Sequence, residues 1–421
     1  MKCETDITIF CLTYNHVQYI RDAFEGFLNQ KTQFTFNIFV YDDASTDGTS
    51  DIVREYKDKY PDIFNIYISE KNLYKATNRE IIMMELYEKY IRGKYVAWCE
   101  GDDYWIDPYK LQLQVQYMEE HPECSMTAHG AVWLDCQNNK KKDYLPFEEE
   151  KDLTAEEIIL QPTGNLSTAS LVMQRKIFMR DVDYPRCGVM DRPLQLYALY
   201  HGKIHFFSKI MSVYRYMHEG SWSMEVQRKF CDEMLHYYDM IRFLKEYDSY
   251  THQEYHKYIR RDIISYLYVG VNSFLKMKES DYRFECKKLD VKTDSKYHNY
   301  LTQQCRVFSW FKGEYILSKE EREQINNNTH VVIMGVGEYS HYVEKILSKN
   351  QVTYSGYIVS YKQDAYSNSK SIWQLADYPY EKEKTLVIVG IHQKSEESVL
   401  KVLEDNHFNN FITPMWIYNE R

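Results

Sequence analysis

The chain has no CxxC pair, and its nine cysteines are scattered singly and odd in number. A structural zinc site or a disulfide framework normally needs paired cysteines, so neither is expected and a reducing compartment is favoured. The first residues, MKCETDITIF, lack the basic segment and apolar run of a signal peptide. No stretch of about 20 apolar residues is present to span a membrane. We therefore expect a soluble, cytoplasmic protein, which leaves peripheral contact with the inner face of the membrane open.

The chain also lacks a basic excess, with 52 Lys and Arg against 62 Asp and Glu, for a net charge of −10. A general nucleic-acid binder usually carries the opposite balance, so no nucleic-acid partner is expected. The 421 residues, of which 44% are hydrophobic, are too many for one ordinary core and indicate two or three globular domains.

The N-terminal region alternates apolar runs with helical patterns. We expect strands at 6–12, 36–41, 65–69 and 95–99, separated by helices at 16–29, 46–59 and 76–91. This alternation predicts an α/β fold with a mostly parallel sheet covered on both faces. Ligands of such sheets bind at the carboxyl ends of the strands, where the acidic clusters 42–43 and 100–103 fall.

Three domains are predicted: 1–225, a helical connector over 226–325, and a smaller Rossmann-like α/β domain over 326–421. In the last, Gly335-Val336-Gly337 follows an apolar strand and precedes a helix, as in a dinucleotide-binding turn. Ser340 stands where the third glycine belongs, and no acidic residue ends the next strand. A structural or interaction role is therefore favoured over bound NAD. The connector leaves a homodimer interface open, but no pattern in it requires one.

The acidic group Glu100-Gly101-Asp102-Asp103 suits a divalent cation. Mg²⁺ and Mn²⁺ prefer oxygen ligands and often bind through one or two carboxylates plus phosphate oxygens. Glu100 and Asp102 would point to the same side of an extended chain, and the glycine between them allows a close turn. Taken alone, the same four residues would rather indicate a solvated acidic turn, so the metal site depends on the motifs that accompany them.

Three strand ends together resemble the family 2 glycosyltransferases, inverting enzymes of the GT-A fold. They read Leu-Thr-Tyr-Asn at 12–15, Tyr-Asp-Asp-Ala-Ser-Thr-Asp-Gly-Thr at 41–49 and Glu-Gly-Asp-Asp at 100–103. Ala44 replaces the family's usual glycine, and Glu100 replaces the first aspartate of its D-x-D element. The resemblance covers about residues 5–225. It implies a nucleotide-sugar donor, with a UDP-sugar favoured, and a Mn²⁺ or Mg²⁺ cofactor.

The resemblance assigns several residues to the donor by position. Thr13 and Asn15 would lie beside the nucleoside, and Asp43 would accept a hydrogen bond from the base. Asn72 and Arg79 follow the third strand, where the family often contacts the donor. Polar side chains that merely face solvent would explain these two residues equally well.

Further positions are implied at the diphosphate and the metal. Asp102 corresponds to the metal-binding carboxylate, Glu100 would lie near the ribose or the metal, and Asp103 would help at the sugar. Residues 213–223, beginning Val-Tyr-Arg-Tyr-Met-His, resemble the family's YR-x-H loop. Arg215 and His218 would therefore meet the diphosphate or the metal, and we assign Arg215 to the donor and His218 to the metal.

An inverting transfer needs a base that takes the proton of the attacking acceptor hydroxyl. Residues 188–194, Gly-Val-Met-Asp-Arg-Pro-Leu, resemble the family segment around that base, and Asp191 is the candidate. A helix N-cap ahead of Pro193 is the alternative role for Asp191.

The sequence thus predicts metal-dependent transfer of a sugar to an acceptor hydroxyl. The resemblance favours a lipid-linked glycan acceptor in cell-surface polysaccharide synthesis. Transfer to a protein or a soluble glycan stays open, as does a non-catalytic binding protein, although the carboxylates at 43, 102 and 191 argue against the latter. A nucleotidylyltransferase is disfavoured because the first strand ends in Thr-Tyr-Asn-His rather than in a glycine-rich basic loop.

Overall fold

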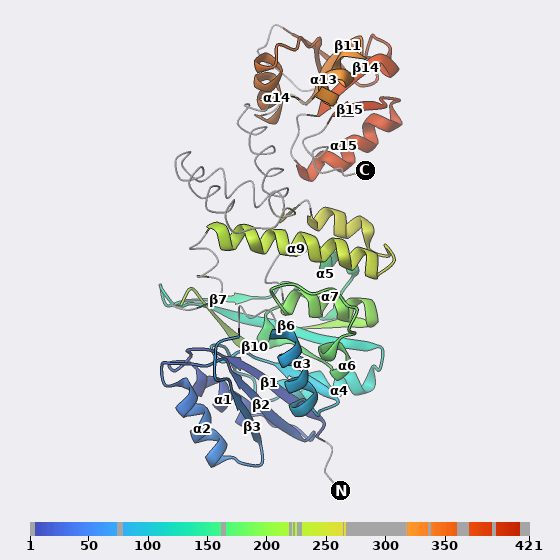
Figure 1. Cartoon of the computed structure of the whole chain (residues 1–421). Coiled ribbons are helices and arrows are strands. Elements are labelled where there is room, and N and C mark those ends of the chain that lie inside the picture. The colour runs from blue at the N-terminus through green and yellow to red at the C-terminus, as the bar shows by residue number, and fades with distance from the viewer. Residues whose placement is uncertain are drawn as a thin grey trace. The chain divides into compact units, whose positions relative to one another are not determined.

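The structure is a computed structural model. It describes residues 5–73, 79–160, 166–218, 221, 224, 230–263, 265–266, 317, 319–335, 338–359, 370–389 and 393–412. The chain divides into two compact units, Met1–Tyr266 and Leu267–Arg421 (Figure 1). The domain boundaries expected at 225 and 325 stay predictions.

A mixed sheet organises the first unit. Its described strands run in the order β3-β2-β1-β4-β9-β6-β10-β5, with β7 paired to β6 and β8 to β10. The first four are parallel and match the expected strands: β1 Ile7–Thr13, β2 Phe36–Asp42, β3 Phe64–Ile68 and β4 Tyr95–Trp98. Their carboxyl ends therefore meet at one edge of the sheet.

The sheet continues beyond β4 through an antiparallel strand. β9, Val172–Gln174, pairs antiparallel with both β4 and β6, and β6 pairs parallel with β10. The remaining strands are β5 Tyr104–Trp105, β6 Cys124–Asp135, β7 Lys140–Tyr144, β8 Lys151–Asp152 and β10 Lys203–Tyr216. The sheet is therefore parallel in its N-terminal part and mixed beyond it.

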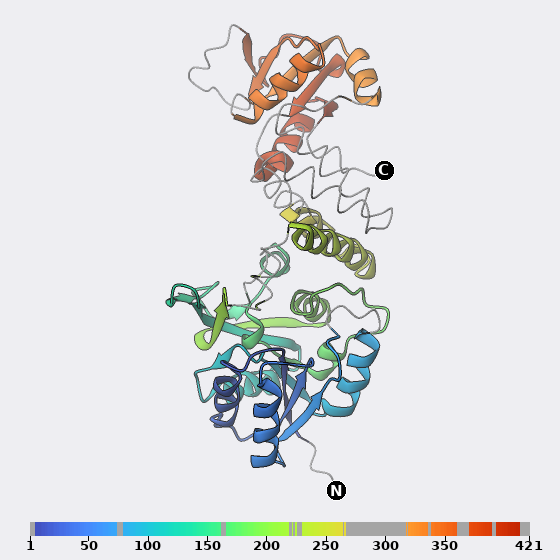
Figure 2. The same cartoon turned by 60° about the vertical axis from the view of Figure 1, so that its left-hand side comes forward.

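Helices cover both faces of this sheet (Figure 1 and Figure 2). Alternation along β1 sends Ile7, Ile9 and Cys11 to one face, where they share a core with helices α1, α2 and α4. Phe10 points to the other face, with ring centroids 5.3 Å from those of Tyr87 on α3 and Phe178 on α6. The helices are α1 Ile20–Leu28, α2 Thr49–Lys59, α3 Arg79–Tyr90, α4 Lys110–Glu120, α5 Ala155–Ile159, α6 Arg175–Met179, α7 Asp191–His201 and α9 Phe230–Tyr250.

The second unit holds a smaller parallel sheet of order β13-β12-β11-β14-β15. Its central strand is β11 His330–Met334, which pairs on one side with β14 Thr385–Val389. The other elements are α13 Lys319–Asn326, α14 Glu338–Lys349, β12 Gly356–Val359, β13 Ser371–Gln374, α15 Gln393–Asp405 and β15 Asn410–Ile412. The predicted α/β class, with a second and smaller C-terminal sheet, is confirmed.

The glycine-containing turn of this second unit is only partly described. Gly335 has φ +93°, in the left-handed region that favours glycine. Val336 and Gly337 lie outside the described residues, so the role expected for this turn stays a prediction. Among the described residues, no helix is long and apolar enough to cross a membrane.

Candidate functional site

The loops that follow β1, β2 and β4 are tied together by backbone hydrogen bonds. The amide of Gly101 donates to the carbonyl of Leu12 at 2.9 Å, and the amide of Asp43 donates to the carbonyl of Thr13 at 3.0 Å. A Cβ on Gly101 would lie 2.7 Å from Oγ1 of Thr13 and 2.6 Å from Cδ1 of Ile20. A side chain at position 101 would therefore force Thr13 or Ile20 to shift where the acidic loop crosses the end of β1.

The carboxylate of Asp43, which follows β2, is held by hydrogen-bond donors. Its Oδ1 accepts from the hydroxyl of Tyr41 at 2.9 Å and from the amide of Leu73 at 2.7 Å. Nδ2 of Asn72 donates to the carbonyl of Asp43 at 3.3 Å. The structure thus brings Asp43 and Asn72 together, whereas the side chain of Arg79 lies outside the described part of the chain. The buried Oγ1 of Thr13 has no hydrogen-bond partner.

Asn15 links the β1 loop to the β2 loop. Its Oδ1 accepts the amide of Thr46 at 2.8 Å, and its own amide donates to Oγ of Ser45 at 2.9 Å. Asn15 and Ala44 both have positive φ values, +55° and +64°. Asparagine tolerates that conformation, but alanine is strained in it, at the position where the family usually has glycine. Asn15 therefore shapes the loop, in addition to the donor contact predicted for it.

Asp102 lies at the centre of the acidic loop between two imidazoles. Its Oδ2 is hydrogen-bonded to Nε2 of His218 at 2.9 Å and lies 3.8 Å from Nε2 of His16. Burial works against ionisation of Asp102, but His16 and His218 outweigh it, so the pKa of Asp102 falls below its ordinary value. Burial, aided by the charge of Asp102, raises the pKa of Asp103 well above its ordinary value. The pKa values of the two adjacent carboxyls are thus shifted in opposite directions, downward for Asp102 and upward for Asp103.

Arg215 fixes this loop from β10. Its amide donates to Oδ1 of Asp103 at 2.8 Å, and its Nη1 donates to the carbonyl of Asp102 at 2.8 Å. Nη2 pairs with Asp22 on α1. The guanidinium carbon also lies 5.1 Å from the ring centroid of Tyr19 and 4.3 Å from that of Tyr104. The buried guanidinium therefore organises the acidic loop, and its predicted contact with the donor stays a prediction.

Asp191 is the first residue of α7, and Met190 is the N-cap residue, without a side-chain capping bond. The alternative role of Asp191 as an N-cap is therefore not observed. Asp191 is half-buried, and desolvation raises its pKa above the ordinary value. Its neighbour Arg192 points elsewhere, into a buried ion pair with Asp262 at 3.0 Å. Among the contacts of the described residues, none joins Asp191 to Asp43, to Asp102 or to the side chains that bind them.

Asp102, in the acidic loop, offers a divalent cation a carboxylate oxygen that has no hydrogen-bond partner among the described residues. Oδ1 of Asp102 is buried and accepts no hydrogen bond, and an imidazole nitrogen of His218 lies beside the other oxygen. A carboxylate oxygen of this kind is a ligand that Mg²⁺ and Mn²⁺ prefer. Within the described residues, no three His, Cys, Asp or Glu side chains already gather as a complete metal site. The residues fit a cation that takes further ligands from a diphosphate.

Sequence reasoning missed two members of this cluster. His16 directly follows the Thr-Tyr-Asn motif, so its position next to a recognised strand end was an available signal. Asp22 carries no such signal, since it occupies the first turn of an amphipathic helix and meets Arg215 only through the fold. Glu100 is half-buried, and its carbonyl accepts the amide of Asp103 at 3.1 Å, which closes the acidic turn.

The family described as Glycosyl transferase family 2 matches residues 8–180. The match spans the β1, β2 and β4 loops that build the site. Residues 8–180 are a family 2 glycosyltransferase domain. The predicted resemblance is confirmed, and the strand ends that carried it are the segments that the structure joins by hydrogen bonds.

Curated relatives of this family 2 domain cover part of the chain. An uncharacterised protein of Mycobacterium tuberculosis is 32% identical over 218 residues, which is 51% of this chain and 60% of that protein. An Escherichia coli protein named UDP-Glc:alpha-D-GlcNAc-diphosphoundecaprenol beta-1,3-glucosyltransferase WfaP is 31% identical over 115 residues, 27% of this chain and 41% of that protein. Among solved structures, S. aureus TarS residues 1–349 align with a TM-score of 0.49 and 15% identity, over 82% of this chain and 89% of that one.

Proposed function

We propose that the chain transfers a sugar from a nucleotide-sugar, with a UDP-sugar favoured, to an acceptor hydroxyl with inversion at the anomeric carbon. The observation that carries the proposal is the state of Asp102 in a family 2 domain. This carboxylate is ionised and keeps one buried oxygen without a partner, beside His218. It lies at the sheet edge where the β1 and β4 loops join.

The donor would lie across the carboxyl ends of the strands. Asp43 would accept a hydrogen bond from the base, with Asn72 held next to it, and Thr13 and Asn15 would border the nucleoside. Arg79 and Glu100 are proposed at the donor from the family resemblance. These residues bind and orient the leaving nucleotide, so that the anomeric carbon faces the acceptor side.

A Mn²⁺ or Mg²⁺ ion held by Asp102 and His218 would supply positive charge for the diphosphate as it leaves. Asp102 is suited to this because it stays ionised despite burial. Asp103, whose pKa is raised by burial and by the charge of Asp102, is proposed to help at the sugar, as the family resemblance implies. Arg215 holds the carboxylate of Asp103 through its amide and the backbone carbonyl of Asp102 through its guanidinium.

Asp191 is proposed as the base that removes the acceptor proton. Burial raises the pKa of Asp191, which makes this side chain a stronger proton acceptor than an ordinary carboxylate. The acceptor is proposed to be a lipid-linked glycan, because a diphosphoundecaprenol-linked sugar stands in the name of the WfaP relative. Such an acceptor would place the protein at the inner face of the membrane.

The test uses two acceptors and one donor panel. Purified chain with Mn²⁺ and a set of UDP-, GDP-, dTDP- and CMP-sugars is offered GlcNAc-diphosphoundecaprenol in detergent or free GlcNAc. We expect a glycosylated lipid by mass spectrometry. Asp191→Asn should retain UDP affinity and lose about 10²–10⁴-fold in transfer rate. The control Asp58→Asn, at an exposed site on α2, should behave as wild type.

Two results would count against parts of the proposal. Glycosylation of free GlcNAc alone would exclude the lipid-linked acceptor, and undiminished turnover by Asp191→Asn would exclude Asp191 as the base.

A further inference from the structure

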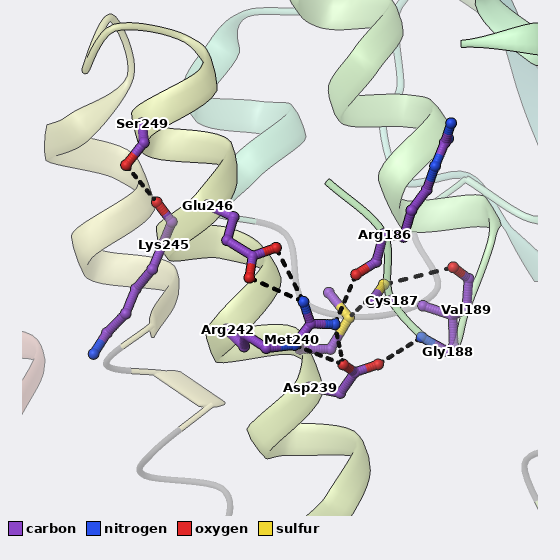
Figure 3. A network of polar contacts seen from close by, with 10 residues as sticks. All are labelled: Arg186, Cys187, Gly188, Val189, Asp239, Met240, Arg242, Lys245, Glu246 and Ser249. Carbon is purple, nitrogen blue, oxygen red and sulfur yellow. Dashed lines mark hydrogen bonds and ion pairs between the residues drawn. The ribbon is translucent and has the colours of Figure 1, made fainter. Parts of the chain in front are cut away.

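Helix α9 binds the segment that leads into Asp191 (Figure 3). Oδ2 of Asp239 on α9 accepts the amide of Gly188 at 2.5 Å, and Nη2 of Arg242 donates to the carbonyl of Arg186 at 2.7 Å. Both contacts are made to backbone atoms. They therefore fix the backbone conformation of residues 186–188 and do not depend on the side chains of those residues. This helix lies within the segment that the sequence predicted to be a connector.

The two α9 side chains also fix each other. Oδ1 of Asp239 accepts from Nε of Arg242 at 3.2 Å and from Nη2 at 2.5 Å. Nη1 of Arg242 donates to both carboxylate oxygens of Glu246 at 3.0 Å. A guanidinium bound on several sides has little rotamer freedom left, so Asp239 presents its second oxygen to Gly188 in one orientation.

Further contacts hold the same segment through Cys187 and Tyr184. Sγ of Cys187 lies 3.8 Å from Sδ of the buried Met240 on α9. The buried ring of Tyr184 packs against Phe243 of α9, with ring centroids 6.0 Å apart, and its hydroxyl donates to the carbonyl of Pro193 at 2.8 Å. Asp191 is therefore flanked by fixed residues on both sides in the sequence. Before it, contacts hold residues 184, 186, 187 and 188, and after it a contact holds residue 193.

We propose that Asp239 is a positioning residue for the sugar transfer, because it holds the 186–190 segment so that Asp191 faces the acceptor. This inference rests on the proposed function. α7 has no side-chain cap at its start, so the direction of its first turn depends on the chain that enters it. In Figure 3, the carboxylate of Asp239 binds the backbone amide of Gly188, three residues before α7 begins.

The test compares three variants of the full chain. Asp239→Ala removes both oxygens, and Asp239→Asn keeps an acceptor for the Gly188 amide but loses the charge that binds Arg242. Lys245→Ala is the matched control, since this exposed side chain on α9 points away from the network (Figure 3). Hydrogen exchange is measured on the 186–190 peptide, UDP binding by calorimetry, and transfer to GlcNAc-diphosphoundecaprenol from the donor that the panel selects.

Positioning predicts a split between binding and turnover. In Asp239→Ala, exchange at 186–190 should rise at least tenfold and kcat should fall at least tenfold, while the UDP Kd stays within twofold of wild type. Asp239→Asn should recover part of both losses, and Lys245→Ala should match wild type throughout.

Two results would overturn the proposal. One is a wild-type kcat in Asp239→Ala despite faster exchange. The other is a parallel fall of UDP affinity, kcat and unfolding temperature, as a merely structural residue would give. If wild type turns over no donor, the proposed function fails separately, and unchanged exchange at 186–190 in Asp239→Ala would then reject the role of Asp239 in holding the segment.

Discussion

Replacement of Arg215 by alanine tests whether this side chain organises the acidic loop. The guanidinium is buried, donates to the carbonyl of Asp102 at 2.8 Å, and lies between the rings of Tyr19 and Tyr104. Its ion pair with Asp22 reaches a half-exposed carboxylate and adds little. Arg215→Ala would therefore remove one strong buried hydrogen bond and two ring contacts.

The expected loss is large for a single side chain. A hydrogen bond from a charged donor contributes about 1.5–3 kcal/mol, and a desolvated cation–π contact about 1–2 kcal/mol. Allowing for overlap between these terms, Arg215→Ala should lower the free energy of unfolding by about 4 kcal/mol. Arg215→Lys keeps a cation but not the planar, two-armed geometry, so about half of that loss should remain.

The assay is urea unfolding of the full chain at neutral pH, with Arg21→Ala as the matched control. Arg21 also pairs with a carboxylate, that of Glu55 at 2.6 Å, but both side chains are about half exposed. The control should therefore cost about 1 kcal/mol or less. If Arg215→Ala costs no more than Arg21→Ala, the guanidinium is not a packed part of the loop, and it would be available to the diphosphate instead.

Three other substitutions have defined outcomes. Ala44→Gly should stabilise the protein by about 1 kcal/mol in urea unfolding, because alanine at φ +64° is strained; equal or lower stability would contradict this. Burial lowers the pKa of Lys110 to about 7, below that of the unfolded chain, so stability should rise as the pH increases above about 7. Lys110→Met should flatten this rise, and parallel pH curves for the two proteins would refute it. Burial raises the pKa of Asp191 in the folded state, so ionisation of this carboxyl lowers the stability of the fold above its unfolded pKa. Asp191→Asn should therefore melt at the same or a higher temperature at pH 7. A lower melting temperature would indicate a structural role.

The N-terminal strands were predictable because each is a short apolar run that ends in a polar motif. β1, β2 and β4 are buried on both faces, which gives continuous hydrophobic stretches, and their ends carry the residues that build the site. The parallel arrangement then brings those ends to one edge. The cluster around Asp102 thus follows from local pattern plus the topology of the fold.

The strand pairing in the second part of the sheet could not be derived in this way. β6 contains His129 and Gly130 within a strand of 12 residues, which weakens the apolar pattern, and its partners in β10 lie about 80 residues further along the chain. β9 has only three residues, too few for any periodicity. Such strands are specified by their partners in the fold, which a local pattern does not show.

Contacts between distant charged residues were also beyond the sequence. The pair of Asp22 with Arg215 joins α1 to β10, and Asp239 reaches Gly188 from a helix expected to belong to a separate connector. Neither carboxylate lies in a motif. Their partners were identifiable only once the fold had brought the elements together.

The most direct test of the account is the release of nucleotide from a donor panel. Purified chain would be incubated with UDP-, GDP-, dTDP- and CMP-sugars and the lipid-linked acceptor, with Mn²⁺ or with EDTA, beside Asp102→Ala and the control Asp58→Ala. We expect release from one donor, a UDP-sugar. EDTA and Asp102→Ala should abolish this release, and Asp58→Ala should leave it intact. Release that is indifferent to both EDTA and Asp102→Ala would contradict it.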